Sequence, residues 1–421
     1  MLHSLKSSIQ KTFTAAVIIL STSLALIASP TRQDNKIMES FTIKSVPAIN
    51  GSYTVSPAIP ADGKVAAGTE LTIKAKPSAG YSLDAIFYTV KGGMWGTTSF
   101  ENFTNEYKVK VEKDMTLGAT FIPSSLVNNL VVKHDISYAK PGAKNLKYDV
   151  YSPKSAKNLP CIVIIHGGGW SSNNEDIMRG LARELTKENK YVVVSIDYRW
   201  VKKLDGDAKP NDMHNLIEDV FGAIAHIREH AAEYGIDPNR IAVTGDSAGG
   251  HLSESAALLT PLIGKGGFGT TQGVYEFLPS YIPAGKTVED LRKELTSSIK
   301  AVAPSYGPSD ASDFKMFIEK TDQGYFDAIS PIKHVPAASE RALPHFIVRG
   351  TKDPIIPIKA IDDYEAALKA AGQKVERYEV EGAGHAFFDW KPDAVTIATF
   401  EKYGVPYAEK MRKFFNGVFY K

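Results

Sequence analysis

The sequence has only one cysteine, Cys161, so it cannot form a disulfide within itself. The residue lies in the apolar run LPCIVIIHGG, where we expect a buried, unreactive thiol. Neither H-E-x-x-H nor C-x-x-C occurs, so we expect no metal site. Forty-nine basic residues nearly balance 47 acidic ones, without a long basic stripe. Nucleic acid is therefore a poor candidate partner.

A long apolar run without charge, TFTAAVIILSTSLALIA at residues 12–28, follows Lys6 and Lys11. The run is long for the apolar part of a secretory signal and short for a membrane span. We therefore expect a signal peptide over residues 1–29, with an uncleaved anchor as the alternative. The expected location is secreted, periplasmic or at the surface of a bacterial cell. A polar linker over residues 30–39 follows.

Residues 40–123 consist of short runs rich in Val, Ile, Thr and Tyr, separated by Gly, Pro, Asn and Asp. This pattern predicts a small all-β module. Its text, from GSYTVSPAIPADGKV to TLGATFI, resembles the internalin-type repeats of bacterial surface proteins. The resemblance implies a spacer or an adhesive module, which would contact a cell surface or a glycan.

The sequence pattern changes again over residues 124–421, where strand-like runs alternate with helical patterns. CIVIIHGG and YVVVSIDYR are apolar without alternation, as expected for strands covered on both faces. Such alternation predicts a mostly parallel central sheet with helices on both faces. Functional sites on sheets of this kind lie at the carboxyl ends of the strands.

Two glycine-rich motifs follow predicted strands. GDSAGG places Ser247 in a G-x-S-x-G turn between a strand and a helix, where a hydroxyl is raised above the end of the sheet. HGGGW places Gly168 and Gly169 where backbone N–H groups can approach a ligand closely. We expect these two N–H groups and that of Ala248 to form an oxyanion hole. His166 is expected to order its own loop.

Two further motifs complete a catalytic set. Asp353 follows the strand HFIVRG, and His385 follows VERYEV, so the chain order is Ser, Asp, His. Serine is a weak nucleophile until an imidazole takes its proton, which is the role expected for His385. Asp353 would fix the tautomer of that imidazole and stabilise its protonated form. Asp246, beside the nucleophile, is expected to support the turn.

Together these motifs resemble the α/β-hydrolase esterases, in particular hormone-sensitive-lipase-like carboxylesterases with HGGG and GDSAGG. DYRW, AVAPSYGPSD and GTKDP also look like bacterial carbohydrate esterases, including acetylxylan and feruloyl esterases. The resemblance implies a cofactor-free serine esterase for carboxylic esters, either small molecules or esters linked to polysaccharides. Short acyl groups, such as acetyl or feruloyl, are favoured because no large apolar lid is evident. One departure is that a β module stands where those lipases usually carry a helical cap.

Other features leave alternatives open. Trp170, Tyr198 and Phe387 lie near the site-forming loops and would contact substrate, although aromatic residues there are equally ordinary packing. Residues 262–298 look like an insertion that supplies a lid or a surface excursion. An amidase or peptidase of the same fold is the alternative enzyme. A non-catalytic surface adhesion protein is the alternative outside enzymes.

Overall fold

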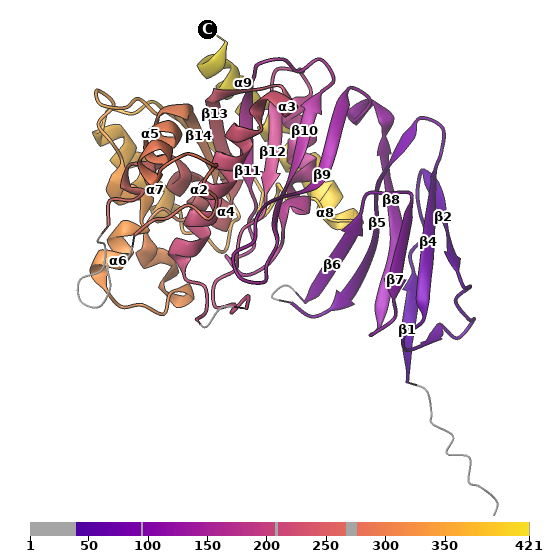
Figure 1. Cartoon of the computed structure of the whole chain (residues 1–421). Helices are drawn as coiled ribbons and strands as arrows, with labels where there is room; N and C mark the ends of the chain where they lie inside the picture. The colour runs from indigo at the N-terminus through magenta and orange to yellow at the C-terminus, as the bar shows by residue number, and fades with distance from the viewer. Residues whose placement is uncertain (1–38, 94–95, 207–208, 267–275, 421) are drawn as a thin grey trace, which may run out of the picture. The chain divides into compact units, whose positions relative to one another are not determined.

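The computed structural model describes residues 39–93, 96–206, 209–266 and 276–420 (Figure 1). The predicted signal peptide and nearly all of the linker lie outside the described residues. The chain divides into two units, Met1–Glu39 and Ser40–Lys421, and only the second is described below. None of the helices in the described ranges has the length and apolar character that a membrane crossing requires.

The first part of the second unit, residues 40–123, is called the β module here. It contains eight strands, which form two sheets of order β3-β1-β8-β5-β6 and β2-β4-β7. Both sheets contribute to one core, in which Leu71 and Ile73 of β4 meet Ile86 of β5 and Leu117 of β8. The strands are β1 (Ser40–Ser45), β2 (Gly51–Ser56), β3 (Lys64–Ala66), β4 (Glu70–Pro77), β5 (Tyr81–Lys91), β6 (Thr97–Asn102), β7 (Glu106–Lys110) and β8 (Met115–Pro123).

The remainder of the unit is built on one eight-stranded sheet, of order β16-β15-β14-β13-β11-β12-β10-β9. The pairings from β12 through β11, β13, β14 and β15 to β16 are all parallel, whereas β10 is antiparallel to β9 and β12. The strands are β9 (Leu130–Ala139), β10 (Leu146–Pro153), β11 (Leu159–Ile165), β12 (Val192–Ile196), β13 (Ile236–Asp246), β14 (Ile299–Ser305), β15 (His345–Gly350) and β16 (Val375–Val380).

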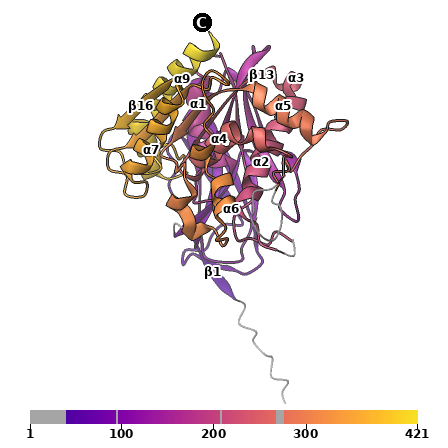
Figure 2. The same cartoon turned by 90° about the vertical axis from the view of Figure 1, so that its left-hand side faces the viewer.

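Helices cover this sheet. Figure 2 shows α1 and α9 on one side of it, with α2 and α5 on the other. The helices are α1 (Arg179–Thr186), α2 (Met213–Glu229), α3 (Ala231–Tyr234), α4 (Ala248–Leu258), α5 (Val288–Ser298), α6 (Gln323–Ala328), α7 (Ile358–Ala370), α8 (Ala394–Thr399) and α9 (Val405–Phe419). The predicted fold class, an α/β-hydrolase sheet preceded by a small all-β part, is confirmed.

The core explains why the central strands lack alternation. Every residue of β11 from Cys161 to Ile165 is fully buried, because helices pack against both faces of that strand. The thiol of Cys161 is buried as predicted, and burial raises its pKa well above the usual range.

The segment predicted as an insertion, residues 262–298, packs partly onto α2. Phe277 is fully buried against Phe221 of α2 in an edge-on ring contact, and the Tyr281 hydroxyl donates a hydrogen bond to Glu229. Residues 267–275 of the segment lie outside the described residues. The described aromatic side chains therefore belong to the packing on α2.

Candidate active site

Ser247 occupies the sharp turn between β13 and α4. Its backbone angles, φ 53° and ψ −117°, are sparsely populated by residues other than glycine and store strain at the turn. The flanking glycines are needed because the chains approach so closely. A Cβ on Gly249 would lie 1.9 Å from the Ile165 carbonyl oxygen, and one on Gly245 would lie 2.3 Å from the Gly249 oxygen. The turn therefore excludes any side chain at these two positions.

The structure brings the three residues of the predicted triad together. His385 follows β16, and its Nε2 lies 2.8 Å from Ser247 Oγ. Its Nδ1 lies 2.8 Å from Oδ2 of Asp353, which follows β15. Both distances are within the range needed for proton transfer from serine to imidazole, with the carboxylate holding the ring.

The Asp353 carboxylate is held in its ionised form. Its side chain is fully buried, and burial alone would raise its pKa. The hydrogen bond and charge of His385 oppose this effect of burial on the pKa. The backbone N–H groups of Ile355 and Ile356, which donate to Oδ1 at 2.8 and 3.1 Å, act in the same direction. The net effect lowers the pKa of Asp353, so this residue presents a negative charge to the imidazole.

The three predicted oxyanion donors lie around the turn. Gly168 and Gly169 have φ values of 125° and 57°, and Ala248 is the first residue of α4. Within the described part of the chain, none of their backbone N–H groups donates a hydrogen bond. The Gly168 carbonyl accepts from Ser171 N and Ser172 Oγ, which closes the loop on itself. Unused N–H groups beside the Ser247 turn are suited to binding an anionic oxygen.

Asp246 supports this arrangement. Its Oδ1 accepts a hydrogen bond of 2.7 Å from Gly167 N, and so joins the Ser247 turn to the glycine loop. Burial and the nearby carboxylate of Asp389 raise the pKa of Asp246 well above its usual range. His166 is also fully buried, with Nδ1 at 2.7 Å from the Gly167 oxygen. His166 therefore orders its own loop and Asp246 supports the turn, as the sequence predicts, and Asp246 also holds the glycine loop.

The three aromatic residues predicted to contact substrate are buried instead. Tyr198 and Phe387 have no exposed surface, and Trp170 retains 4%. The Tyr198 ring stacks on His166 at 4.2 Å, and its hydroxyl donates to the His166 carbonyl. Trp170 packs against Phe314, with ring centroids 4.7 Å apart. These aromatic side chains pack against neighbouring rings and offer a substrate little or no surface.

Tyr306 is a supporting residue that the sequence analysis did not identify. It follows β14 in the SYG segment, with its ring edge-on to His385 at a centroid distance of 4.9 Å. The Tyr306 hydroxyl accepts a hydrogen bond from Phe388 N, three residues after the histidine. The sequence signal was available, because the residue follows a strand end at the same edge of the sheet as Ser247.

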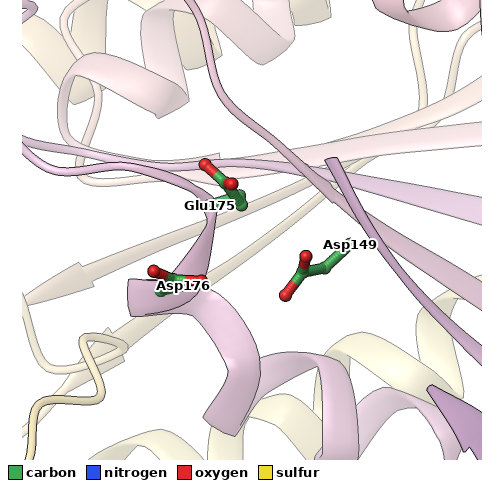
Figure 3. A group of neighbouring side chains, drawn as sticks. All are labelled: Asp149, Glu175 and Asp176. Carbon is green, nitrogen blue, oxygen red and sulfur yellow. The ribbon is translucent and has the colours of Figure 1, made fainter. Parts of the chain in front are cut away.

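One group of described side chains has a geometry that could hold a metal ion. Asp149 of β10 and the successive residues Glu175 and Asp176 each offer a carboxylate oxygen, all within 4.8 Å of one another (Figure 3). Asp149 already bonds His134 and the backbone N–H of Asp135. Burial and neighbouring carboxylates raise the pKa values of Glu175 and Asp176, the latter to about 7. Protonation therefore relieves the repulsion in this group without a cation.

Comparison with known proteins agrees with this architecture. Esterase LipQ of Mycobacterium tuberculosis is 28% identical over 302 residues, which cover 68% of this chain and 64% of LipQ. Carboxylesterase NlhH of the same species is 39% identical over 124 residues, which cover 29% of this chain and 37% of NlhH. This chain thus spans less than two thirds of the length of these relatives.

A solved structure of esterase 2 from Thermogutta terrifontis, phosphorylated by paraoxon, superposes with a TM-score of 0.51 at 24% identity. The match covers 70% of this chain and 96% of that one, and it supports the fold. Residues 148–368, more than half of the sequence, match the family described as BD-FAE. They include the strands that carry Ser247 and Asp353, so this chain, with its α/β-hydrolase fold and its likeness to carboxylesterases, belongs to the BD-FAE family.

Proposed function

We propose that this protein is a carboxylic ester hydrolase in which Ser247 is the nucleophile. The observation that carries the proposal is the continuous hydrogen-bonded chain from Ser247 Oγ through both ring nitrogens of His385 to Asp353. The family and the relatives named esterases support the same reaction class.

In the proposed reaction, His385 Nε2 takes the Ser247 proton as Oγ attacks the ester carbonyl carbon. The negative charge that develops on the carbonyl oxygen is received by the N–H groups of Gly168, Gly169 and Ala248. Such donors each lower the barrier by about 3 kcal/mol. His385 then gives its proton to the leaving alcohol, and an acyl-enzyme remains. In the second half of the reaction, His385 takes a proton from a water molecule, which attacks the acyl carbon. The carboxylic acid is then released as the proton returns to Ser247 Oγ.

The substrate class we propose is an ester with a short acyl group, either a small molecule or acetyl or feruloyl esters on a polysaccharide. This proposal rests on the resemblance of DYRW, AVAPSYGPSD and GTKDP to bacterial carbohydrate esterases. A structure titled as a truncated carbohydrate esterase from gut microbiota superposes with a TM-score of 0.50 at 24% identity, a likeness of fold alone. Secretion, supported by the apolar run at residues 12–28, would bring the enzyme to such polymers. The β module is proposed to contact a cell surface or a glycan.

The first experiment is mass spectrometry of the purified protein after reaction with an organophosphonate, a probe for activated serine. We expect modification at Ser247 and none in the His385→Ala variant, because the hydroxyl then has no base. Hydrolysis of nitrophenyl acetate should exceed that of the matching anilide, which separates an esterase from an amidase. A folded wild-type protein that is neither labelled nor active would contradict the proposed function. Acetylated and feruloylated xylan then test the substrate class.

A further inference from the structure

The β module contributes a buried carboxylate, that of Asp84 on β5, to the other part of the unit. Its side chain is fully buried and accepts five hydrogen bonds. Thr120 Oγ1 donates from within the module at 3.1 Å. Arg179 donates through Nε and Nη2 at 3.1 and 3.2 Å, and Arg183 through Nη1 at 2.8 Å. The fifth donor is Trp390 Nε1, at 3.0 Å.

The two arginines of α1 depend on the module for their charge partners. Their side chains are 1% and 5% exposed. Within the described residues, every ion pair of Arg179 and Arg183 is made with Asp84 or with Glu101 of β6. Burial opposes ionisation of Asp84, but the two guanidinium groups lower its pKa well below the usual range. A buried guanidinium without its carboxylate is strongly destabilising, so the module is more than a spacer.

Trp390 connects Asp84 and helix α1 to the loop that carries His385. It lies five residues after His385, in the loop between β16 and α8. Its backbone N–H donates to the Ile177 carbonyl at 2.8 Å, and its ring packs so closely on Gly180 that a Cβ there would lie 2.8 Å from Cε3. The Arg183 guanidinium covers the ring at 4.5 Å. The loop is thus fixed at its far end by contacts with α1 and with Asp84.

We propose that Asp84 is a positioning residue for the esterase site, because its hydrogen bond to Trp390 fixes the loop that carries His385. The inference rests on the proposed function and extends it, since it makes the β module a part of the catalytic unit. Only four residues separate His385 from Trp390, so a change in the position of the indole ring is passed to the imidazole through a short stretch of backbone. The imidazole must stay within hydrogen-bond distance of both Ser247 and Asp353.

The test compares Trp390→Phe with Glu101→Gln in the full chain. Trp390→Phe keeps an aromatic ring on Gly180 but removes the N–H that donates to Asp84. Glu101→Gln also removes a contact between the module and α1, since it breaks the 2.5 Å ion pair with Arg179, but it leaves Trp390 bonded. For nitrophenyl acetate, we expect Trp390→Phe to lower kcat about tenfold with KM unchanged. Glu101→Gln should keep kcat within about twofold.

A second readout does not depend on turnover. The Nδ1 proton that His385 shares with Asp353 gives a downfield proton NMR signal, assigned by its loss in His385→Ala. We expect this signal to shift or broaden in Trp390→Phe and in Asp84→Asn, and to stay unchanged in Glu101→Gln. An unchanged signal and kcat in Trp390→Phe would overturn the proposal, as would equal losses in Glu101→Gln. A wild-type protein with the signal but no ester hydrolysis would refute the proposed function and leave the positioning role to be judged by the NMR comparison.

Discussion

Replacement of Gly168 by alanine tests the oxyanion hole most directly. This glycine has φ 125°, a conformation that residues with a side chain rarely adopt. An added Cβ would lie 2.3 Å from the Ser172 carbonyl oxygen and 2.9 Å from Asn173 Nδ2. The Asn173 amide can swing aside, but the Ser172 backbone cannot, so the loop must shift and the Gly168 N–H must leave the position proposed for binding the oxyanion.

The expected loss in rate follows from the loss of one donor. Removing a single oxyanion donor lowers kcat by about 100- to 1000-fold, or about 3 kcal/mol. Backbone strain at such a position also costs about 1–3 kcal/mol of stability. The assay is kcat and KM for nitrophenyl acetate, with the concentration of competent sites counted by organophosphonate titration. A fall in kcat with little change in KM is the signature of an interaction made in the transition state.

Gly372→Ala provides the matched control. Gly372 also has a positive φ, of 76°, but the atom nearest to an added Cβ there is the Ala338 Cβ, at 3.6 Å. Alanine there has room, so we expect a small loss in melting temperature and no change in kcat. If Gly168→Ala stays folded and keeps kcat within about threefold of wild type, the assignment of its N–H to the oxyanion hole is wrong.

Three further predictions concern Asp246 and Gly249 near the site, and Asp176 in the carboxylate group that it forms with Asp149 and Glu175. Asp246→Asn should keep most of the activity because its amide oxygen can still accept from Gly167 N, whereas Asp246→Ala leaves that N–H unpaired and should cost about 1–3 kcal/mol in chemical denaturation. Asp176→Asn should raise the melting temperature at pH 8 more than at pH 5. The pKa of Asp176 is raised to about 7, so its protonated form contributes stability that is complete below about pH 4 and is lost as pH rises through 7. Equal changes in melting temperature at pH 5 and pH 8 would contradict this. Gly249→Ala should give no soluble protein, because its Cβ would overlap the Ile165 carbonyl; a folded variant would show that the turn can open.

The sequence predicts the fold and the candidate triad because their signals are local. The alternation of apolar strands and amphipathic helices is written within segments of about 10 to 20 residues. Ser247, Asp353 and His385 each stand at the end of such a strand, and parallel strands bring their carboxyl ends to one edge of the sheet. The order of the strands in the sheet then brings these residues together, although they are separated by up to 138 positions.

The burial of the aromatic residues could not be predicted in this way. Tyr198 follows a strand end as a substrate-binding residue would, but its hydroxyl turns inward to the His166 carbonyl. Position along the chain does not determine which way a side chain turns when both sides of a loop are available. The contact of Asp84 with Trp390, 306 positions apart, carries no local pattern at all. It depends on where the β module rests against α1, which only the three-dimensional structure provides.

Asp246 and Asp353 illustrate how the environment of identical side chains leads to different proposed roles. Asp246 adjoins Ser247 in sequence, yet burial beside Asp389 raises its pKa, and one of its oxygens is taken by Gly167 N. Asp353 is equally buried at its carboxylate, but three N–H donors, from His385, Ile355 and Ile356, favour its charged form. Only an ionised carboxylate can stabilise the imidazolium that forms during the proposed attack. The opposite shifts of the two pKa values support the proposed role of Asp353 as the acid of the triad and that of Asp246 as a structural residue.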